Sequence, residues 1–347
     1  MLKTSKGLWP KTETLITKGM IMALGIRFLA SVLCVTLPAF AAAAQPLTIK
    51  VGYGPGGGYD DAARLLADHI GPYLPGKPNV VVENVPGAGS LKLAKMIMQS
   101  PATDGAEIAT ISSALALMPI FDPQNTDFDP LKVHYLVSMT NSASYCYTPK
   151  SSGINTLDAF LTKEFKVGAT GKDSSTYIYP AAIKHALNAH YDIVTGFQGS
   201  AEIDLAMERG DIQARCGVGI STLFQGDYMD RFNVILELST SPRGEIKDVP
   251  FVLDQPMDPA TRDALKLVMS SGSIHFPFIA APGTSDARLA ELRQAFEALK
   301  TDQAFIDDAR ARGFALIMTS GAEVENMIDG FLASDPAVKE RARALVQ

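Results

Sequence analysis

The sequence has no cluster of Lys and Arg, and its 37 acidic residues outnumber its 31 basic ones. Nucleic acids and anionic membrane surfaces bind proteins mainly through groups of basic side chains, so neither is an expected partner. The chain also contains no low-complexity segment and no short-period repeat. Its length is that of two globular domains rather than one.

Long apolar runs are also lacking. The longest one near the N-terminus covers residues 28–37, about half of the roughly 20 residues that a membrane span requires. Small residues follow it at 39–44, and basic residues precede it at Lys3, Lys6, Lys11, Lys18 and Arg27. This order is typical of a secretory signal peptide over residues 1–44, cleaved near Ala44, and a start at Met20 or Met22 would give it a more usual length.

Export would place the mature chain in the periplasm. Removing residues 1–44 takes away five of the 31 basic residues and one of the 37 acidic residues, so the net charge becomes −10. Local dipoles must then hold any anionic ligand, because no basic patch is available. No long apolar segment follows the signal peptide, so we expect the mature protein to be soluble.

Motifs for catalysis are absent as well. The sequence has neither the nucleophile elbow G-x-S-x-G nor the zinc motif H-E-x-x-H, and its five histidines are scattered. We therefore expect no catalytic residue, no metal site and no cofactor. A hydrolase with an unrecognised triad has no positive support in the sequence.

One segment of the sequence formally fits a nucleotide-binding motif. Residues 52–57 formally fit G-x-G-x-x-G after a predicted strand, and Glu83 stands where a ribose-binding acid would be. However, Asp60 and Asp61 follow the glycines and put two negative charges where a pyrophosphate would approach. No lysine follows as a phosphate-binding P-loop requires. A dinucleotide or nucleotide enzyme is therefore disfavoured.

Cysteines are few, three in the chain, and Cys34 lies within the predicted signal peptide. An oxidising compartment would allow Cys146 and Cys216 to form a disulfide. Two separate buried thiols are the alternative, and the sequence does not decide between them.

The remaining pattern is of the α/β class. Strand, polar turn, helix and strand follow one another twice along the chain, which is typical of right-handed βαβ units around a parallel sheet. The first series has strands at 47–51, 79–83 and 107–111, with helices between them. The second has strands at 165–169, 192–195 and 212–216, with helices at 179–189 and 202–208. Three further helices are predicted at 286–299, 302–312 and 322–333.

Two glycine turns mark a candidate binding site. Residues 54–60 and 86–90 each stand where a strand leads into a helix, so their backbone N–H groups face the positive end of a helix dipole. Such a turn binds a carboxylate without any basic residue. In a parallel sheet both turns lie at the same carboxyl edge. The alternative is that the glycines only permit tight turns with positive φ.

The second half of the chain offers similar groups. Residues 172–176 precede a helix and supply hydroxyls and backbone donors, as do Gly199 and Ser200. They are either ordinary helix caps or ligand contacts from a second, facing domain.

Several of these segments together resemble a known family. Residues 55–60, 81–89 and 104–105, followed by 247–250 and 280–284, are similar to the substrate-binding receptors of tripartite tricarboxylate transporters, the Bug family of periplasmic solute-binding proteins. The resemblance covers nearly all of the mature chain. No single turn is specific, but their combination and order are.

The resemblance implies a type II periplasmic binding protein fold, in which two α/β domains are joined by a two-segment hinge. Domain 1 would contain residues 45–144 and 276–347, domain 2 would contain 145–275, and the crossings would lie near 144–149 and His275. The implied function is a monomeric receptor that captures a small carboxylate and delivers it to the permease subunits of a membrane transporter, without bond-making chemistry. A ligand sensor for a membrane kinase, or an enzyme on the same fold, is the alternative.

The resemblance also implies the ligand contacts. They are Gly56, Gly57, Gly58 and Tyr59 of the first turn, Gly87, Ala88 and Ser90 of the second, Ser112, and Ser174, Ser175 and Thr176 from domain 2. The sequence departs from the usual family pattern at Tyr59, Ser90, 197–200 and Gly217. Tricarboxylates, dicarboxylates, aromatic acids and amides therefore all remain open as ligands.

Overall fold

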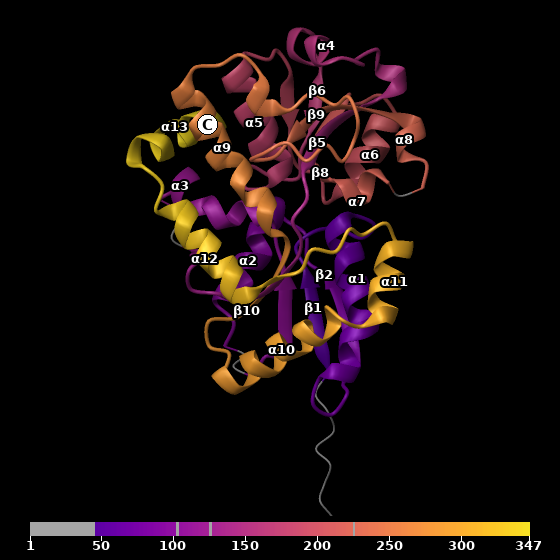
Figure 1. Cartoon of the computed structure of the whole chain (residues 1–347), viewed down its shortest axis with the longest axis vertical. Coiled ribbons are helices and arrows are strands. Elements are labelled where there is room, and N and C mark those ends of the chain that lie inside the picture. Colours follow the sequence, from indigo (N-terminus) through magenta and orange to yellow (C-terminus); the bar gives the residue numbers. More distant parts are fainter. Residues whose placement is uncertain (1–45, 102–103, 125–126, 225) are drawn as a thin grey trace, which may run out of the picture. The chain divides into compact units, whose positions relative to one another are not determined.

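Two β-sheets organise the chain in a computed structural model that describes residues 46–101, 104–124, 127–224 and 226–347 (Figure 1). The predicted signal peptide lies outside the described residues. Each sheet is covered by helices on both faces, so the α/β class predicted from the sequence is confirmed.

The first sheet has six strands in the order β11-β4-β10-β3-β1-β2. β1 pairs in parallel with β2 and β3, whereas β10 runs antiparallel to β3 and β4, and β11 runs antiparallel to β4. The sheet is therefore mixed, not purely parallel as the sequence pattern predicted. Its strands are β1 (Leu47–Val51), β2 (Val80–Asn84), β3 (Glu107–Thr110), β4 (His134–Thr140), β10 (His275–Ala280) and β11 (Thr319–Ser320).

Alternate residues of this sheet reach two separate apolar cores. Phe278 and Ala280 of β10 pack with α1 (Gly58–Ile70), α10 (Asp286–Leu299) and α11 (Gln303–Ala311). Ile279, between them, packs on the other face with α2 (Leu91–Met98) and α12 (Gly321–Leu332). The period of two along a strand explains why one segment serves both cores.

The second sheet has five strands in the order β7-β6-β8-β5-β9. β6 is parallel to β7 and β8, and β5 is antiparallel to β8 and β9. The strands are β5 (Ser144–Pro149), β6 (Lys166–Gly168), β7 (Asp192–Val194), β8 (Ala214–Gly219) and β9 (Phe232–Leu238).

Helices cover this sheet on both faces too. α5 (Ser175–Leu187) packs on β8 and contacts α9 (Pro259–Met269) and α13 (Pro336–Val346), while α6 (Ser200–Glu208) contacts β5 and β8. The shorter helices are α3 (Met118–Phe121), α4 (Leu157–Thr162), α7 (Ile220–Leu223) and α8 (Tyr228–Arg231). Single 3-10 turns occur at Gly71–Tyr73, Ala88–Ser90, Ser113–Leu117, Lys150–Ser152, Val252–Asp254 and Ser270–Ile274.

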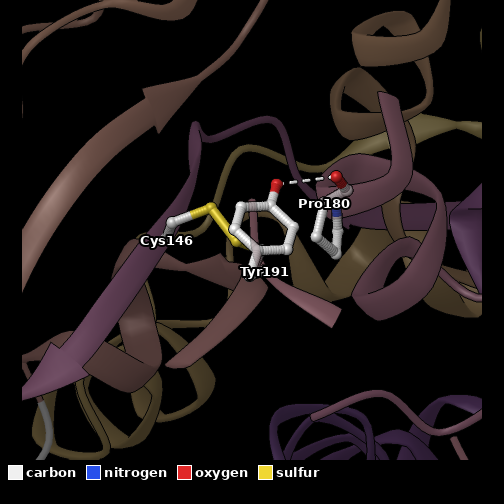
Figure 2. Close-up of a disulfide and its surroundings, with 4 residues drawn as sticks. Cys146, Pro180 and Tyr191 are labelled. Atoms are coloured by element: carbon white, nitrogen blue, oxygen red, sulfur yellow. Dashed lines mark hydrogen bonds between the residues drawn. A yellow bond between two sulfur atoms is a disulfide. The ribbon is translucent and has the colours of Figure 1, made fainter. Parts of the chain in front are cut away.

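Cys146 of β5 and Cys216 of β8 form a disulfide across these two neighbouring strands. Both side chains are fully buried. Figure 2 shows the ring of Tyr191 beside the bridge, and the Tyr191 hydroxyl donates a hydrogen bond to the carbonyl of Pro180 at 2.7 Å. The structure thus contains the disulfide, and not the two separate buried thiols that the sequence left open as the alternative.

We call the first sheet with its helices the first lobe, and the second sheet with its helices the second lobe. The chain passes from the first sheet to the second between Thr140 and Ser144, and it returns between Leu238 and His275. α13 packs on α5 and α9 of the second lobe, although the predicted domain 1 extends to residue 347. The described residues all belong to one compact unit, so the predicted domain boundaries stay a prediction.

None of the helices within the described residues is long and apolar enough to cross a membrane.

Candidate functional site

A small cavity lies where turns of the two lobes face each other. The first lobe contributes Tyr53, Gly58, Tyr59, His275 and Phe276. The second contributes mainly polar or small residues, among them Thr170, Ser175, Thr176, Ser200, Arg215 and Gly217. The free space between them is only about 30 Å³. The two lobes also touch beside it, because the Gly54 N–H donates a hydrogen bond to the Gln198 carbonyl at 2.8 Å.

Three helices begin at this cavity. α1 and α5 have 13 residues each and α6 has nine, and their first residues, Gly58, Ser175 and Ser200, all line it. None of the three is capped by a side chain. The first N–H groups of a helix have no partner within it and carry the positive end of its dipole. Three such ends around one cavity favour an anion.

The shape of the first turn depends on Asp60. Its Oδ2 accepts hydrogen bonds from the Gly56 N–H at 3.0 Å and from Arg64 at 2.9 Å, and its Oδ1 accepts one from Asn84 at 2.9 Å. Burial alone would raise the pKa of Asp60, but these donors outweigh it and lower the pKa. The carboxylate is therefore ionised and paired inside the turn, so it does not face the cavity as a free charge.

Arg215 is the cation of the site. It lies on β8, is only 4% exposed and lines the cavity. Its Nη1 donates to both carboxylate oxygens of Asp204, at 3.1 and 3.0 Å, and its Nη2 donates to the Ser200 hydroxyl. Its Nε is buried and has no hydrogen-bond partner among the residues that the structure describes.

Tyrosines complete this buried network. Arg215 Nη1 also donates to the Tyr147 hydroxyl at 3.1 Å, and the hydroxyls of Tyr147 and Tyr228 donate to Asp204. Burial works to lower the pKa of Arg215, but Tyr147 and Asp204 outweigh it and raise the pKa. The guanidinium therefore stays charged and is fixed in one place.

Aromatic rings form the wall on the first-lobe side. Tyr59 lies 4.7 Å from the Tyr53 ring and 4.9 Å from the Phe276 ring, measured between centroids, and His275 stacks on Phe276 at 4.1 Å. The Tyr59 hydroxyl accepts a hydrogen bond from the Ser113 N–H at 3.1 Å, and burial raises the pKa of Tyr59 to about 12. This wall is rigid and uncharged at neutral pH.

His275 belongs to the same wall and is also neutral. Burial lowers its pKa to about 4, and no described residue forms a hydrogen bond with its Nδ1. Among the described residues that line the cavity, none is acidic. The lining therefore contains one fixed positive charge, helix N-termini and neutral groups.

Four of the predicted ligand contacts line the cavity, namely Gly58, Tyr59, Ser175 and Thr176. Gly56 and Gly57 belong to the same turn but are not part of the lining. A Cβ atom at Gly57 would lie only 3.0 Å from the Cβ of Ser200, so this turn packs closely against the start of α6.

The other predicted contacts serve the packing of the two lobes or the local backbone. Gly89, beside Ala88, approaches Ser174 so closely that a Cβ atom at Gly89 would lie 3.0 Å from the Ser174 nitrogen. The Ser90 hydroxyl accepts a hydrogen bond from the Ser112 N–H at 2.8 Å, and Ser112 caps the 3-10 turn that follows it. Gly87 has a φ of 147°, which favours glycine. A ligand role for these residues stays a prediction.

Sequence reasoning missed most of the side-chain groups of the cavity. Arg215 had a usable signal, because an arginine within a strand of small and apolar residues is rarely buried unless it is paired. Tyr53, His275 and Phe276 had none, since aromatic residues at strand ends are equally common in cores. Within the parts of the chain that the structure describes, no group of three His, Cys, Asp or Glu side chains is placed to hold a metal ion.

Comparison with known proteins identifies the class of fold. No model of a protein family matches the chain. Three solved structures share the fold. The periplasmic binding protein BugD has a TM-score of 0.64 at 15% identity, over 87% of this chain and 95% of its own. MatC (Rpa3494) from Rhodopseudomonas palustris with bound malate has 0.68 at 15% identity, over 88% and 99%. The R. palustris protein Rpa4515 with adipate has 0.68 at 14% identity, over 86% and 97%.

The chain shares the fold of these three proteins, so the predicted periplasmic binding protein fold is confirmed. In sequence, the chain is 34% identical over 118 residues to the UPF0065 protein in the gbd 5′ region of Cupriavidus necator. This match covers 34% of this chain and 35% of that protein's length, about a third of each.

Proposed function

We propose that this protein is a periplasmic receptor that captures a small carboxylate and delivers it to a membrane transporter. The observation that carries the proposal is the convergence of three uncapped helix N-termini and Arg215 on a cavity without an acidic lining residue. A carboxylate there would accept hydrogen bonds from helix N–H groups that no side chain caps. The adipate and malate named for two proteins of the same fold are carboxylates as well.

Binding would proceed by closure of two domains. We infer that they correspond to residues 45–144 with 276–347 and to residues 145–275, and that they move about the crossings of the chain near 144–149 and His275. α13 packs on α5 and α9 and would move with residues 145–275. The ligand would first meet the α1 turn of domain 1, and domain 2 would then add α5, α6 and Arg215. Because the free space is about 30 Å³, a ligand of several carbon atoms requires the lobes to separate before it enters.

The partners would be the permease subunits of a tripartite transporter, which would receive the closed, loaded form in the periplasm. The protein would act as a monomer without a cofactor and without a catalytic step. Two described groups at the cavity favour the absence of acid–base catalysis, because Arg215 is held charged by Asp204 and His275 is held neutral, so neither is poised to exchange a proton at neutral pH.

A ligand screen tests the proposal. Purified protein would be heated with mono-, di- and tricarboxylates, aromatic acids and the corresponding amides, and hits would be titrated by calorimetry. A ligand at about 100 times its Kd stabilises the native state by about 2.7 kcal/mol, so a rise in Tm of about 5 °C is expected for at least one carboxylate. Absence of a shift with every carboxylate, together with a shift for a neutral ligand, would contradict the carboxylate assignment.

A further inference from the structure

Arg215 has a second feature beyond its charge, and it bears on which ligands the cavity accepts. We propose that Arg215 determines ligand specificity by donating a hydrogen bond from Nε to a second acceptor oxygen of the ligand, in addition to the carboxylate that the helix N-termini bind. The inference rests on the proposed function. It predicts that carboxylates with a second oxygen acceptor are selected over equally long carboxylates that end in an alkyl group.

The guanidinium is held rigidly. Asp204 engages Nη1 with both oxygens and Ser200 engages Nη2, while the Tyr147 and Tyr228 hydroxyls fix Asp204 in turn. Both members of the ion pair are at least nine-tenths buried. A donor fixed in this way loses little freedom when a ligand binds, so its hydrogen bond contributes nearly its full strength to affinity.

The Nε atom of the Arg215 guanidinium lacks a hydrogen-bond partner within the described part of the chain. The atom is also shielded from solvent. Leaving a buried charged donor unpaired is costly, and proteins rarely do so without a functional reason. Arg215 and Ser200 both line the cavity, so an acceptor placed there by a ligand would complete the network.

Arg215 and residues of the first lobe line the same cavity. Tyr53 is one of these residues, and its hydroxyl donates to the Gly89 carbonyl at 3.3 Å. Burial is the main cause that raises the pKa of Tyr53. The positive charge of Arg215, which belongs to the other lobe, acts to lower this pKa. The N-terminus of α1 and Arg215 therefore border the same cavity from different lobes, with Ser200 in contact with both.

The donors outnumber what one carboxylate can accept. A carboxylate has about four acceptor positions. The starts of α1, α5 and α6 already present several backbone N–H groups, and Nε of Arg215 adds a charged donor. Asp204 compensates the charge of Arg215, so the second acceptor of the ligand can be a second carboxylate or a neutral amide oxygen, but an alkyl group would leave Nε unpaired.

The test compares matched ligands on matched variants. For the carboxylate class that binds the wild type, calorimetry would measure Kd for three ligands of equal length that end in a carboxylate, a primary amide or a methyl group. Arg215→Lys keeps a positive charge beside Asp204 but removes the Nε donor. Arg231→Lys is the control, because Arg231 lies on the same lobe, is partly exposed and pairs with Asp227 and Glu208 outside the cavity.

The wild type and Arg231→Lys should prefer the ligands with a second acceptor by about 10- to 100-fold, the range expected for one charged hydrogen bond. In Arg215→Lys this preference should fall to less than about 3-fold. If Arg215→Lys retains the full preference, the inference is overturned while the receptor function stands. If the wild type binds no carboxylate at all, both fail.

A second variant is used for the test if Arg215→Lys does not fold. If circular dichroism shows that Arg215→Lys is unfolded, the double variant Asp204→Asn with Arg215→Gln replaces the ion pair by a neutral pair of similar size. It should bind the methyl-ended and amide-ended ligands with similar Kd. A preserved preference in the folded double variant would overturn the inference in the same way.

Discussion

Arg215 and His275 are buried beside the same cavity, but their surroundings favour opposite charge states. Arg215 has Asp204 at 3.0 Å and remains charged, whereas the His275 ring is buried beside Tyr59 and Phe276 and remains neutral. A buried charge is stable only when it is paired. The same rule therefore gives the cavity one cation and leaves its second basic side chain without a charge.

The neutral His275 predicts a pH dependence of stability. Its pKa is about 4 in the folded protein and about 6.5 in an unfolded chain, so between these values the unfolded state binds more protons. The free energy of unfolding should fall by about 1.4 kcal/mol for each pH unit below 6.5, down to about pH 4. Urea denaturation at pH 7 and pH 5 measures this.

His275→Asn provides the control for that dependence. It cannot take up a proton, so its loss of stability between pH 7 and pH 5 should be smaller than that of the wild type by about 2 kcal/mol. An identical loss in both proteins would assign the pH dependence to other groups.

Gly57 lies at the start of α1, where its φ of −125° is accessible to any residue. We expect Gly57→Asp to weaken carboxylate binding by more than about 100-fold, because its charge would repel the ligand and occupy the free N–H groups of α1. Gly57→Ala adds the same Cβ atom near Ser200 without a charge and should weaken binding by less than about 10-fold. Calorimetric Kd values for the two variants separate charge from bulk, and equal values would remove the first turn from the binding site.

At the level of elements, local sequence was a reliable guide where a strand leads into a helix. The predicted strand 47–51 and helix 286–299 have the bounds observed for β1 and α10. α5 begins at Ser175, four residues before the predicted start, because Ser174 already has the extended backbone of an N-cap. Its apolar periodicity starts later, so the pattern alone placed the start too far along the chain.

The antiparallel strands were missed for a different reason. β4, β5, β9 and β10 are buried on both faces, and their sequences show no alternation of polar and apolar residues. A short apolar run of this kind does not distinguish a strand from another buried segment. Because these strands pair in antiparallel orientation, both sheets are mixed.

The disulfide joins two of these elements and predicts a stability effect. Cys146 and Cys216 are 70 residues apart in sequence. Closing a loop of that length removes entropy from the unfolded chain, so replacing both cysteines by Ala should lower the free energy of unfolding by about 4 kcal/mol. Urea denaturation of the double variant, with and without dithiothreitol, measures this.

The reducing agent supplies the control. Dithiothreitol should bring the wild type close to the double variant and leave the variant unchanged. Two free thiols in the unfolded, unreduced wild type would contradict the bridge.

For the whole molecule, the contact between the lobes predicts which glycines permit closure. A Cβ atom at Gly171 would lie 2.4 Å from the Gly89 nitrogen, so even Ala would hold the lobes apart. The backbone of Gly171 is outside the left-handed region, so each lobe should still fold. We expect Gly171→Ala to weaken ligand binding at least about 10-fold while changing Tm little without ligand. Calorimetry and thermal unfolding measure the two quantities.

Gly330 offers a matched control. It lies inside α12, and a Cβ atom there would meet nothing within 4 Å. Gly330→Ala should raise stability by about 0.5–1 kcal/mol through helix propensity and leave the Kd unchanged. Ligand affinity unaffected in Gly171→Ala would show that binding does not require this contact.

The α/β class, the resemblance to the Bug proteins and the position of the α1 turn could all be predicted from the sequence. Each of these is encoded locally, because the glycines, the strand before them and the helix after them are neighbours in the chain. Gly58 and Tyr59 could therefore be named in advance as candidate contacts.

The residues that surround that turn are set by the packing of distant segments. Arg215, Asp204 and Tyr147 are distant in sequence from Gly58, and they come together because β8, α6 and β5 pack side by side. The acidic composition suggested that backbone dipoles alone would hold an anion. A buried arginine contributes because packing, which no local pattern encodes, supplies the carboxylate that allows its charge to be buried.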